Sequence, residues 1–310
     1  MTTNNQSNES VREIFRIITA HKQREGGGFI VRRPFPSYGL TVVDPFLLID
    51  EMGPVDYAPG EAVGAPDHPH RGFETVTYVL EGEMEHEDSA GHRGSLRAGD
   101  VQWMTAGAGI IHSEEPSRAM REKGGRVHGF QIWINLPARL KMTRPRYQEL
   151  AAAKIPVAET ADGRARVRVI AGEALGVRAA IDTHTPITYQ DWTVAEGADL
   201  TLPLPREQHA LIYVFEGNVR LGNSGNEPAG GLVTDGQMAI LADGDAVRFR
   251  GVAGGGRFLL LSGVPLGEPV ARYGPFVMNN EAEIAEAVQD YQSGRMGEIT
   301  RTAEVTAEIP

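Results

Sequence analysis

Two pairs of side chains with metal-binding chemistry occur at the same short spacing. His68 and His70 lie two residues apart, and His112 and Glu114 repeat that spacing further along the chain. Residues two apart in a β-strand point to the same side, so the two pairs could face each other across a barrel interior. Burying three imidazoles and a carboxylate without a counter-ion is unfavourable, and a divalent cation offsets that penalty. The spacing therefore predicts a metal site.

The residue types also limit which metal could bind. The chain contains no cysteine, which excludes thiol catalysis, cysteine-ligated zinc and iron–sulfur clusters. Three imidazoles and one carboxylate suit Fe(II), Mn(II), Ni(II), Cu(II) or Zn(II), and a redox role requires open coordination positions. The residues alone leave the choice among these metals open.

The elements that must position these ligands are predicted to be short strands. The 310 residues include 37 Gly and 19 Pro, distributed through the sequence between short apolar runs. These runs lie at 46–49, 75–80, 101–104 and 130–134, and again at 187–194, 209–215, 237–241, 247–250 and 258–261. We expect an all-β protein with a polar extension at 1–28, one domain at 29–145 and a second at 146–310, separated by a proline-containing connector.

An internal repeat supports two similar barrels. Tyr-Val-Leu-Glu-Gly at 78–82 recurs as Tyr-Val-Phe-Glu-Gly at 213–217, and residues 99–107 match 236–244 in pattern. The positions of the three histidines correspond in the second copy to Pro203, Pro205 and approximately Phe249. Only the first copy is therefore expected to hold a histidine metal site.

Two further features are local. Asn280 is a helix N-cap followed by Glu281 and Glu283, with Gly294 as the stop, which predicts one helix near the C-terminus. His86 and His92 flank a predicted turn, where they could form an exposed pair. No third ligand is evident for that pair, so no role is assigned to it.

The net charge and the hydropathy of the chain limit which classes of binding partner are expected. The net charge of −11 disfavours direct nucleic-acid binding, because a polyanion would be repelled. No apolar stretch is long enough to span a membrane, and the first ten residues lack the features of a signal peptide. We expect a cytoplasmic protein without membrane or nucleic-acid partners.

Longer motifs give the chain a family resemblance. They are His-Pro-His-Arg-Gly-Phe-Glu-Thr-Val at 68–76, His-Glu-Asp-Ser at 86–89, Gly-Asp-Val-Gln-Trp-Met-Thr-Ala-Gly at 99–107, Gly-Ile-Ile-His-Ser-Glu at 109–114, Asp-Pro-Phe-Leu-Leu at 44–48, Trp-Ile-Asn-Leu-Pro at 133–137 and Gly-Pro-Phe-Val-Met-Asn at 274–279. Over residues 29–297 the sequence resembles the pirin family of bicupins. The resemblance implies two cupin barrels of the jelly-roll type and one non-haem iron in the first.

The resemblance also implies a ligand set. It places the metal ligands at His68, His70, His112 and Glu114, with Fe(II) as the first choice of ion. Many metal-binding cupins outside the pirins instead use a glutamate at the position of Glu74. That residue is an even number of positions from His70, so spacing alone leaves Glu74 and Glu114 both open. We prefer Glu114 on the family pattern.

Two functions follow from the resemblance. Several pirins are similar in activity to quercetin 2,3-dioxygenases, which implies a flavonol and O2 as substrates and a depside and CO as products. Glu114 would then act as the general base that removes the flavonol hydroxyl proton. Eukaryotic pirins instead resemble iron-dependent, redox-sensing modules that bind transcription regulators, which implies a regulatory protein as partner.

Overall fold

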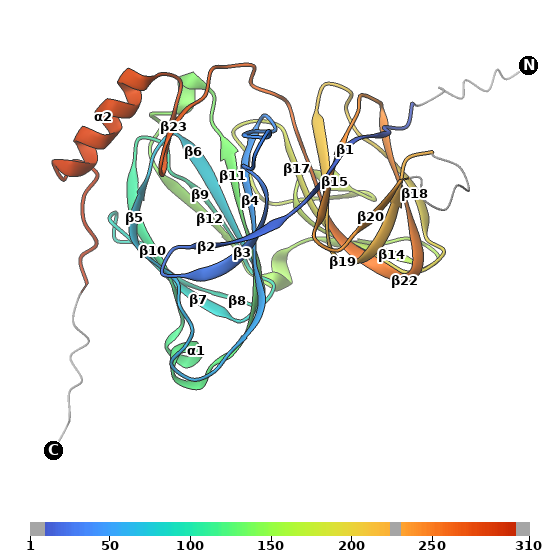
Figure 1. Cartoon of the computed structure of the whole chain (residues 1–310), viewed down its shortest axis with the longest axis horizontal. Coiled ribbons are helices and arrows are strands. Elements are labelled where there is room, and N and C mark those ends of the chain that lie inside the picture. Colours follow the sequence, from blue (N-terminus) through green and yellow to red (C-terminus); the bar gives the residue numbers. More distant parts are fainter. Residues whose placement is uncertain (1–9, 224–230, 302–310) are drawn as a thin grey trace, which may run out of the picture.

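The computed structural model describes residues 10–223 and 231–301, and it shows two β-barrels side by side (Figure 1). The barrel coloured blue to green comes first in the sequence, and the yellow to orange barrel follows. Helices are short and peripheral. The predicted all-β, two-barrel architecture is therefore confirmed.

The N-terminal barrel consists of two antiparallel sheets. The first contains, in spatial order, β12 (Arg146–Leu150), β9 (Val101–Thr105), β6 (Phe73–Glu81), β11 (Gly125–Asn135), β4 (Phe46–Tyr57), β3 (Phe29–Phe35) and β2 (His21–Glu25). The second contains β5 (Ala65–His70), β10 (Ile110–Pro116), β7 (Glu83–Asp88) and β8 (Arg93–Arg97). Because β12 pairs with β9, this barrel extends beyond the expected boundary at residue 145.

The C-terminal barrel is built on one large sheet. Its main path is β1 (Ile14–Thr19), β21 (Gln237–Leu241), β19 (His209–Leu221), β22 (Ala246–Gly263), β17 (Ile187–Val194), β14 (Ala165–Ala171) and β13 (Val157–Glu159), with β18 (Asp199–Pro203) beside β22 and β20 (Leu232–Thr234) beside β19. Two short strand pairs lie outside these sheets, β15 (Glu173–Ala174) with β16 (Val177–Arg178) and β23 (Ala271–Tyr273) with β24 (Phe276–Met278). The helices are α1 (Arg118–Lys123) and α2 (Glu281–Gln292), and there are 3-10 turns at Ala138–Leu140 and Ala152–Lys154. Among the described residues, no helix is long and apolar enough to cross a membrane.

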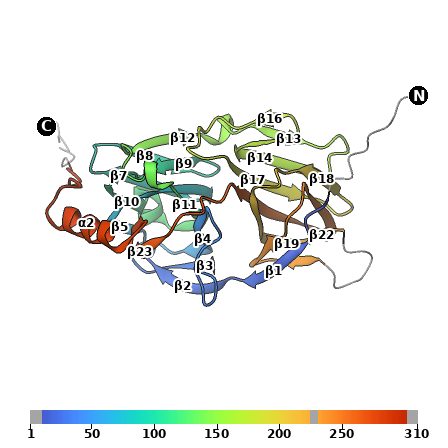
Figure 2. The same cartoon turned by 90° about the horizontal axis from the view of Figure 1, so that it is seen from above.

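The N-terminal strands contact both barrels. β1 pairs with β21 of the C-terminal barrel, and β2 then joins the N-terminal barrel, so one segment runs along both (Figure 2). Residues 1–28 were expected to form a polar extension, but 14–25 are strands within the fold, while 1–9 lie outside the described residues. The sequence signal was weak because only Ile14 and Ile18 of β1 pack on the cores.

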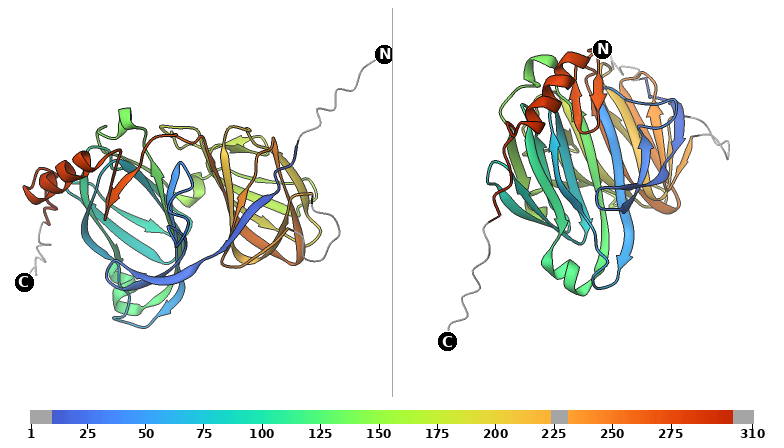
Figure 3. Two further views of the ribbon diagram at one scale, coloured as in Figure 1. Left: turned by 45° about the horizontal axis from the view of Figure 1, so that its top comes forward. Right: turned by 60° about the vertical axis from the view of Figure 1, so that its left-hand side comes forward.

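The C-terminal segment returns to the N-terminal barrel. α2 lies against the outside of that barrel in both views of Figure 3, and Ile111 of β10 packs with Phe276 and Ala287. The predicted helix is confirmed in detail: the Asn280 side chain accepts a hydrogen bond from the Glu283 backbone N–H at 3.0 Å.

Equivalent residues of the internal repeat make equivalent contacts between the two barrels. The hydroxyl of Tyr78 donates to Asp191 of the other barrel at 2.7 Å, and the equivalent Tyr213 donates to Glu51 at 2.5 Å. Both tyrosines belong to one apolar cluster that spans the two barrels. This contact fixes the outer face of β6, so that its alternate residues, including Thr77, face the interior of the N-terminal barrel.

Candidate metal centre

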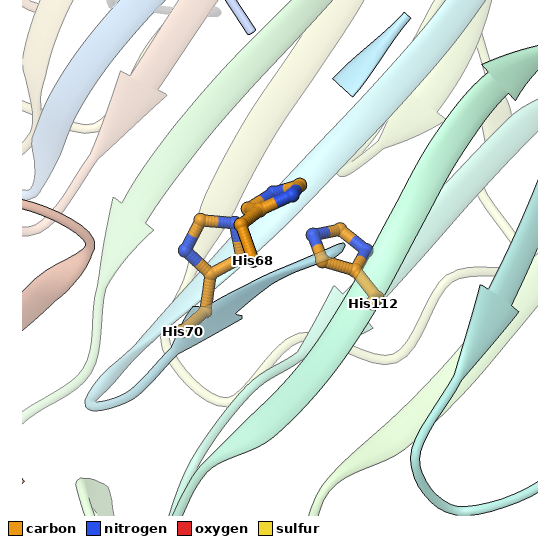
Figure 4. A group of neighbouring side chains, drawn as sticks. All are labelled: His68, His70 and His112. Atoms are coloured by element: carbon orange, nitrogen blue, oxygen red, sulfur yellow. The ribbon is translucent and has the colours of Figure 1, made fainter. Parts of the chain in front are cut away.

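Three histidines meet inside the N-terminal barrel. His68 and His70 lie on β5, and His112 lies on β10 directly opposite His68 in the antiparallel pair. The ring centroids are 4.3 to 4.9 Å apart, and each ring offers a nitrogen within 4.8 Å of the other two (Figure 4). The two-residue spacing of His68 and His70 therefore places both side chains on the same face of β5, as strand alternation predicts.

The surroundings of the rings match a metal site. His68 Nδ1 donates to the Pro66 carbonyl oxygen at 2.7 Å, which leaves Nε2 with a free lone pair. Within the described ranges, His70 Nδ1 and both ring nitrogens of His112 are buried without a hydrogen-bond partner. Burial and the neighbouring His68 hold the pKa of His70 and His112 well below the usual value, so both rings are neutral at pH 7. Neutral imidazoles with unused lone pairs fit a divalent cation.

The corner after His70 is fixed by contacts that only glycine permits. Gly72 has φ +88°, and a Cβ there would come within 2.0 Å of the Val277 carbonyl oxygen. Lys141 holds the same corner, because its buried Nζ donates to the backbone oxygens of Gly72 and Val277 and to Asn135 Oδ1 at 2.7 to 3.0 Å. The burial of Lys141 lowers its pKa to about 8. The C-terminal segment therefore helps to position the histidines.

Glu114 lies beside the three histidines without joining their group. Its Oε1 accepts a hydrogen bond from the Thr77 hydroxyl at 2.8 Å, and its Oε2 accepts one from Gln131 Nε2 at 2.9 Å. Among the described residues, the group of ligand atoms within 4.8 Å contains the histidines alone. Gln131 was not predicted, although a polar side chain in the apolar run 130–134 was the available signal.

Glu74, the alternative carboxylate, points away from the histidines. β5 ends at His70 and β6 starts at Phe73, so the alternation on which the alternative depended is broken between them. Glu74 Oε1 accepts a hydrogen bond from Thr105 at 2.6 Å and lies 4.0 Å from His184. Burial raises the pKa of Glu74 to about 7. Its position excludes it from the histidine cluster.

A cavity of about 590 Å³ opens beside the cluster. His68, His70, Glu114 and Gln131 line it, together with the apolar side chains of Phe29, Ile30, Leu48, Met52, Val55, Val63, Val127 and Trp133. The Trp133 ring lies 5.2 Å from His70 and is covered by the Arg272 guanidinium at 4.7 Å. The cavity is large enough for a flat aromatic ligand. Its lining also includes charged side chains away from the cluster, namely Glu25, Arg33, Asp50, Asp67, Glu83 and Arg272.

A second group of ligands was missed. His86, Asp88 and His92 also place ligand atoms within 4.8 Å of one another, and His86 and Asp88 are each only 2% exposed. An exposed pair is therefore wrong for His86, whereas the predicted turn between the two histidines is confirmed as the end of the β7–β8 hairpin. Asp88 sits at the start of the predicted turn, and no pattern in the sequence indicates that it is buried together with His86.

Comparisons with known proteins cover most of the chain. Residues 28–134 match the family model described as Pirin, and residues 189–297 match that of the Pirin C-terminal cupin domain. A pirin-like protein of Solanum lycopersicum is 42% identical over 92% of this chain and 93% of its own length, and the Pirin of Rattus norvegicus is 41% identical over 93% and 94%. The crystal structure of a quercetin 2,3-dioxygenase from Acinetobacter baumannii superposes with a TM-score of 0.86 at 38% identity, covering 94% of this chain and all of that one.

Proposed function

Because the chain belongs to the pirin family, we propose that it is a metal-dependent dioxygenase that opens a flavonol such as quercetin with O2. Both oxygen atoms enter the product, a depside, and the excised ring carbon leaves as CO. The similarity to a solved quercetin 2,3-dioxygenase supports this reaction. The observation that carries the proposal is that His68, His70 and Glu114 line a largely apolar cavity, with His112 buried directly behind them in the same histidine cluster.

The resident ion in this proposal is Fe(II), held by His68, His70, His112 and Glu114. The three imidazoles already converge, and the donor set lacks the thiolates that favour a closed zinc site. Once bound, the ion supplies positive charge that favours loss of the flavonol hydroxyl proton and, when redox-active, exchanges electrons with dioxygen.

Glu114 is suited to two positions. In the structure its two carboxylate oxygens accept hydrogen bonds from Thr77 and Gln131, which orient the carboxylate. Moving to the histidines would give up at least one of these hydrogen bonds, and moving back would recover it. A carboxylate that could leave the ion for this hydrogen-bonded position would be free to accept the flavonol hydroxyl proton at Oε.

The side chains that line the cavity would bind the substrate and exclude water. Leu48, Met52 and Trp133 present apolar surface on which the flat rings of a flavonol can lie. Desolvation by these groups excludes water from the reacting carbon and strengthens the electrostatic effect of the nearby charges. The polar groups at the cluster then fix which hydroxyl is presented.

Oxygen uptake and CO release with quercetin test the proposal. Iron-loaded protein should turn over, metal-free protein should not, and Glu114→Gln should lower kcat by roughly 100-fold or more, as expected for loss of a general base. The matched control is Glu115→Gln, since the next residue on β10 points to the opposite face and should leave kcat unchanged.

Two results would contradict the proposal. Equal turnover by metal-free protein would separate the reaction from the histidine cluster. Metal-loaded protein that is inert toward flavonols would favour the alternative, a redox-sensing module that binds a regulatory protein. Elemental analysis of untagged protein, made alongside the assays, identifies the ion that the site selects.

A further inference from the structure

The second cluster of ligands lies on the hairpin formed by β7 and β8 and in the turn between them. His86 and Asp88 project from the same face of β7, two residues apart, and pair across to Glu114 and His112 of β10. His92 follows the turn. The three residues take no part in the proposed dioxygenase chemistry, and their burial requires an explanation.

Asp88 holds the turn with one oxygen and leaves the other unused. Its Oδ1 accepts hydrogen bonds from the backbone N–H groups of Ala90 and His92, each at 2.8 Å. These bonds fold the chain so that the rings of His92 and His86 lie 5.7 Å apart. Asp88 Oδ2 is buried and, within residues 10–223 and 231–301, has no hydrogen-bond partner.

The neighbouring donor atoms are equally unsatisfied. Both ring nitrogens of His86, Nδ1 of His92 and the hydroxyl of Tyr147 are buried and lack a hydrogen-bond partner in the described part of the chain. Buried polar atoms are rarely left without partners in native proteins. Several such atoms around one point indicate a missing partner common to all of them.

The spacing of these atoms fits a shared ion. Asp88 Oδ2 lies 4.0 Å from His86 Nε2, which is too long for a hydrogen bond. Donors that each bind one ion at about 2.0 to 2.2 Å stand about 3 to 4 Å apart, so a small contraction would close the site. The Tyr147 ring stacks on His92 at 4.5 Å and lies 4.9 Å from His86, which restricts both imidazoles.

We propose that His86, Asp88 and His92 form a second binding site for a divalent transition-metal ion. Two imidazoles and one carboxylate are the ligands that Zn²⁺, Fe²⁺ and similar ions accept, and the ion satisfies the unused lone pairs. Asp88 serves twice, since Oδ1 shapes the turn and Oδ2 binds the ion. The Tyr147 hydroxyl lies beside the site and completes its polar surroundings.

The second site stands next to the first. The His86 ring is 5.3 Å from the ring of His112, so His112 separates the two clusters. Cations in both sites would repel each other through this short gap, and the first cluster offers three imidazoles where the second offers two and a carboxylate. Binding is therefore stepwise, with the second equivalent weaker than the first.

Zinc titration of metal-stripped, untagged protein tests the proposal. Equilibrium dialysis with elemental analysis should find two equivalents of Zn²⁺ in the wild type and one in Asp88→Asn. The asparagine keeps Oδ1 for the turn and removes the anionic ligand atom. His92→Gln, whose ring is half-buried, should lose the same equivalent, whereas His209→Gln on the other barrel should keep both.

Diffraction at the zinc absorption edge locates the second ion. A peak among His86, Asp88 and His92 is expected in wild-type crystals grown with Zn²⁺ and should be absent from crystals of the Asp88→Asn variant. A single equivalent in the wild type would overturn the proposal, and so would a second equivalent that both variants retain. Thermal unfolding of each variant verifies that it is folded, and His92→Gln provides the answer should Asp88→Asn misfold.

Discussion

The two barrels share a strand pattern but differ in what they enclose. In the C-terminal barrel the rings of Trp192, Phe249 and Phe258 are fully buried and pack at centroid distances of 4.9 and 5.0 Å. In the N-terminal barrel the corresponding volume holds histidines, carboxylates and a cavity. One barrel is filled with apolar packing, and the other holds the histidine cluster and the cavity.

Equivalent positions show the difference directly. β18 pairs with β22 so that Leu200 lies opposite Phe249, just as β5 pairs with β10 so that His68 lies opposite His112. By this pairing the counterpart of His68 is Leu200, and the correspondence with Pro203 expected from the sequence repeat is wrong, because Pro203 lies opposite Ala246. On β6 the inward-facing Thr77 supports Glu114, whereas Ile212, its counterpart in the repeat, packs in an apolar core. The same backbone therefore serves either purpose, and the side chains at a few inward positions decide which.

The repeat persists where the barrels touch. Val76 and Tyr78 face the shared core, as do their counterparts Leu211 and Tyr213. The inward faces differ, whereas the outward faces share apolar and tyrosine positions through which each barrel packs against the other. This shared core buries apolar side chains of both barrels and so stabilises both.

The largest effect on stability is expected in the apolar barrel. Phe249→Ala should lower the free energy of unfolding by about 3 to 5 kcal/mol, since the side chain is fully buried between two aromatic rings. Metal content should not change. Guanidinium denaturation with elemental analysis measures both. A loss below about 1 kcal/mol would mean that this interior is less tightly packed than the contacts indicate.

Metal removal should act only on the other barrel. At a thousand times its dissociation constant, an ion bound by the native state alone adds about 4 kcal/mol, so a chelator should lower Tm. Calorimetry with and without chelator measures the shift. His68→Gln should reduce the shift, whereas His209→Gln should retain it, because the described residues of its barrel form no histidine cluster. An unchanged Tm in chelated wild-type protein would contradict a resident ion.

The sequence predicted those parts of the fold that depend on local pattern. Alternating strands, the repeat, the helix capped by Asn280 and the convergence of the three histidines all follow from residue spacing, and the structure confirms them. The ligand role of Glu114 stays a prediction, because its carboxylate hydrogen-bonds Thr77 and Gln131 in the structure.

The remaining features depend on contacts between residues far apart in the sequence, which local patterns do not predict. The partner of β1 lies over two hundred residues away on β21, and nothing in its own short sequence specifies that pairing. The direction of Glu74 depends on a break of the strand at Gly72, which a close approach of Val277 requires. The second ligand cluster depends on how Asp88 bends the chain, which single-residue patterns do not reveal.

The smallest predicted effect concerns a buried carboxyl group outside the metal cluster. Because burial raises the pKa of Glu74 to about 7, the folded protein keeps a proton that the unfolded chain loses near pH 4.5. Stability should therefore fall as pH rises from about 4.5 to 7, by at most about 3 kcal/mol. Glu74→Gln removes this penalty and should be more stable than the wild type at pH 8.

Denaturation of both proteins at pH 5 and pH 8 measures the difference, and Glu196→Gln, an exposed position on the C-terminal barrel, is the control. The advantage of Glu74→Gln over the wild type should shrink toward pH 5, where the wild-type carboxyl keeps its proton in the folded state. An equal advantage at both pH values would assign the effect to the hydrogen bond with Thr105 rather than to charge burial. It would also mean that the buried polar groups of the N-terminal barrel destabilise it less than the comparison with its apolar neighbour implies.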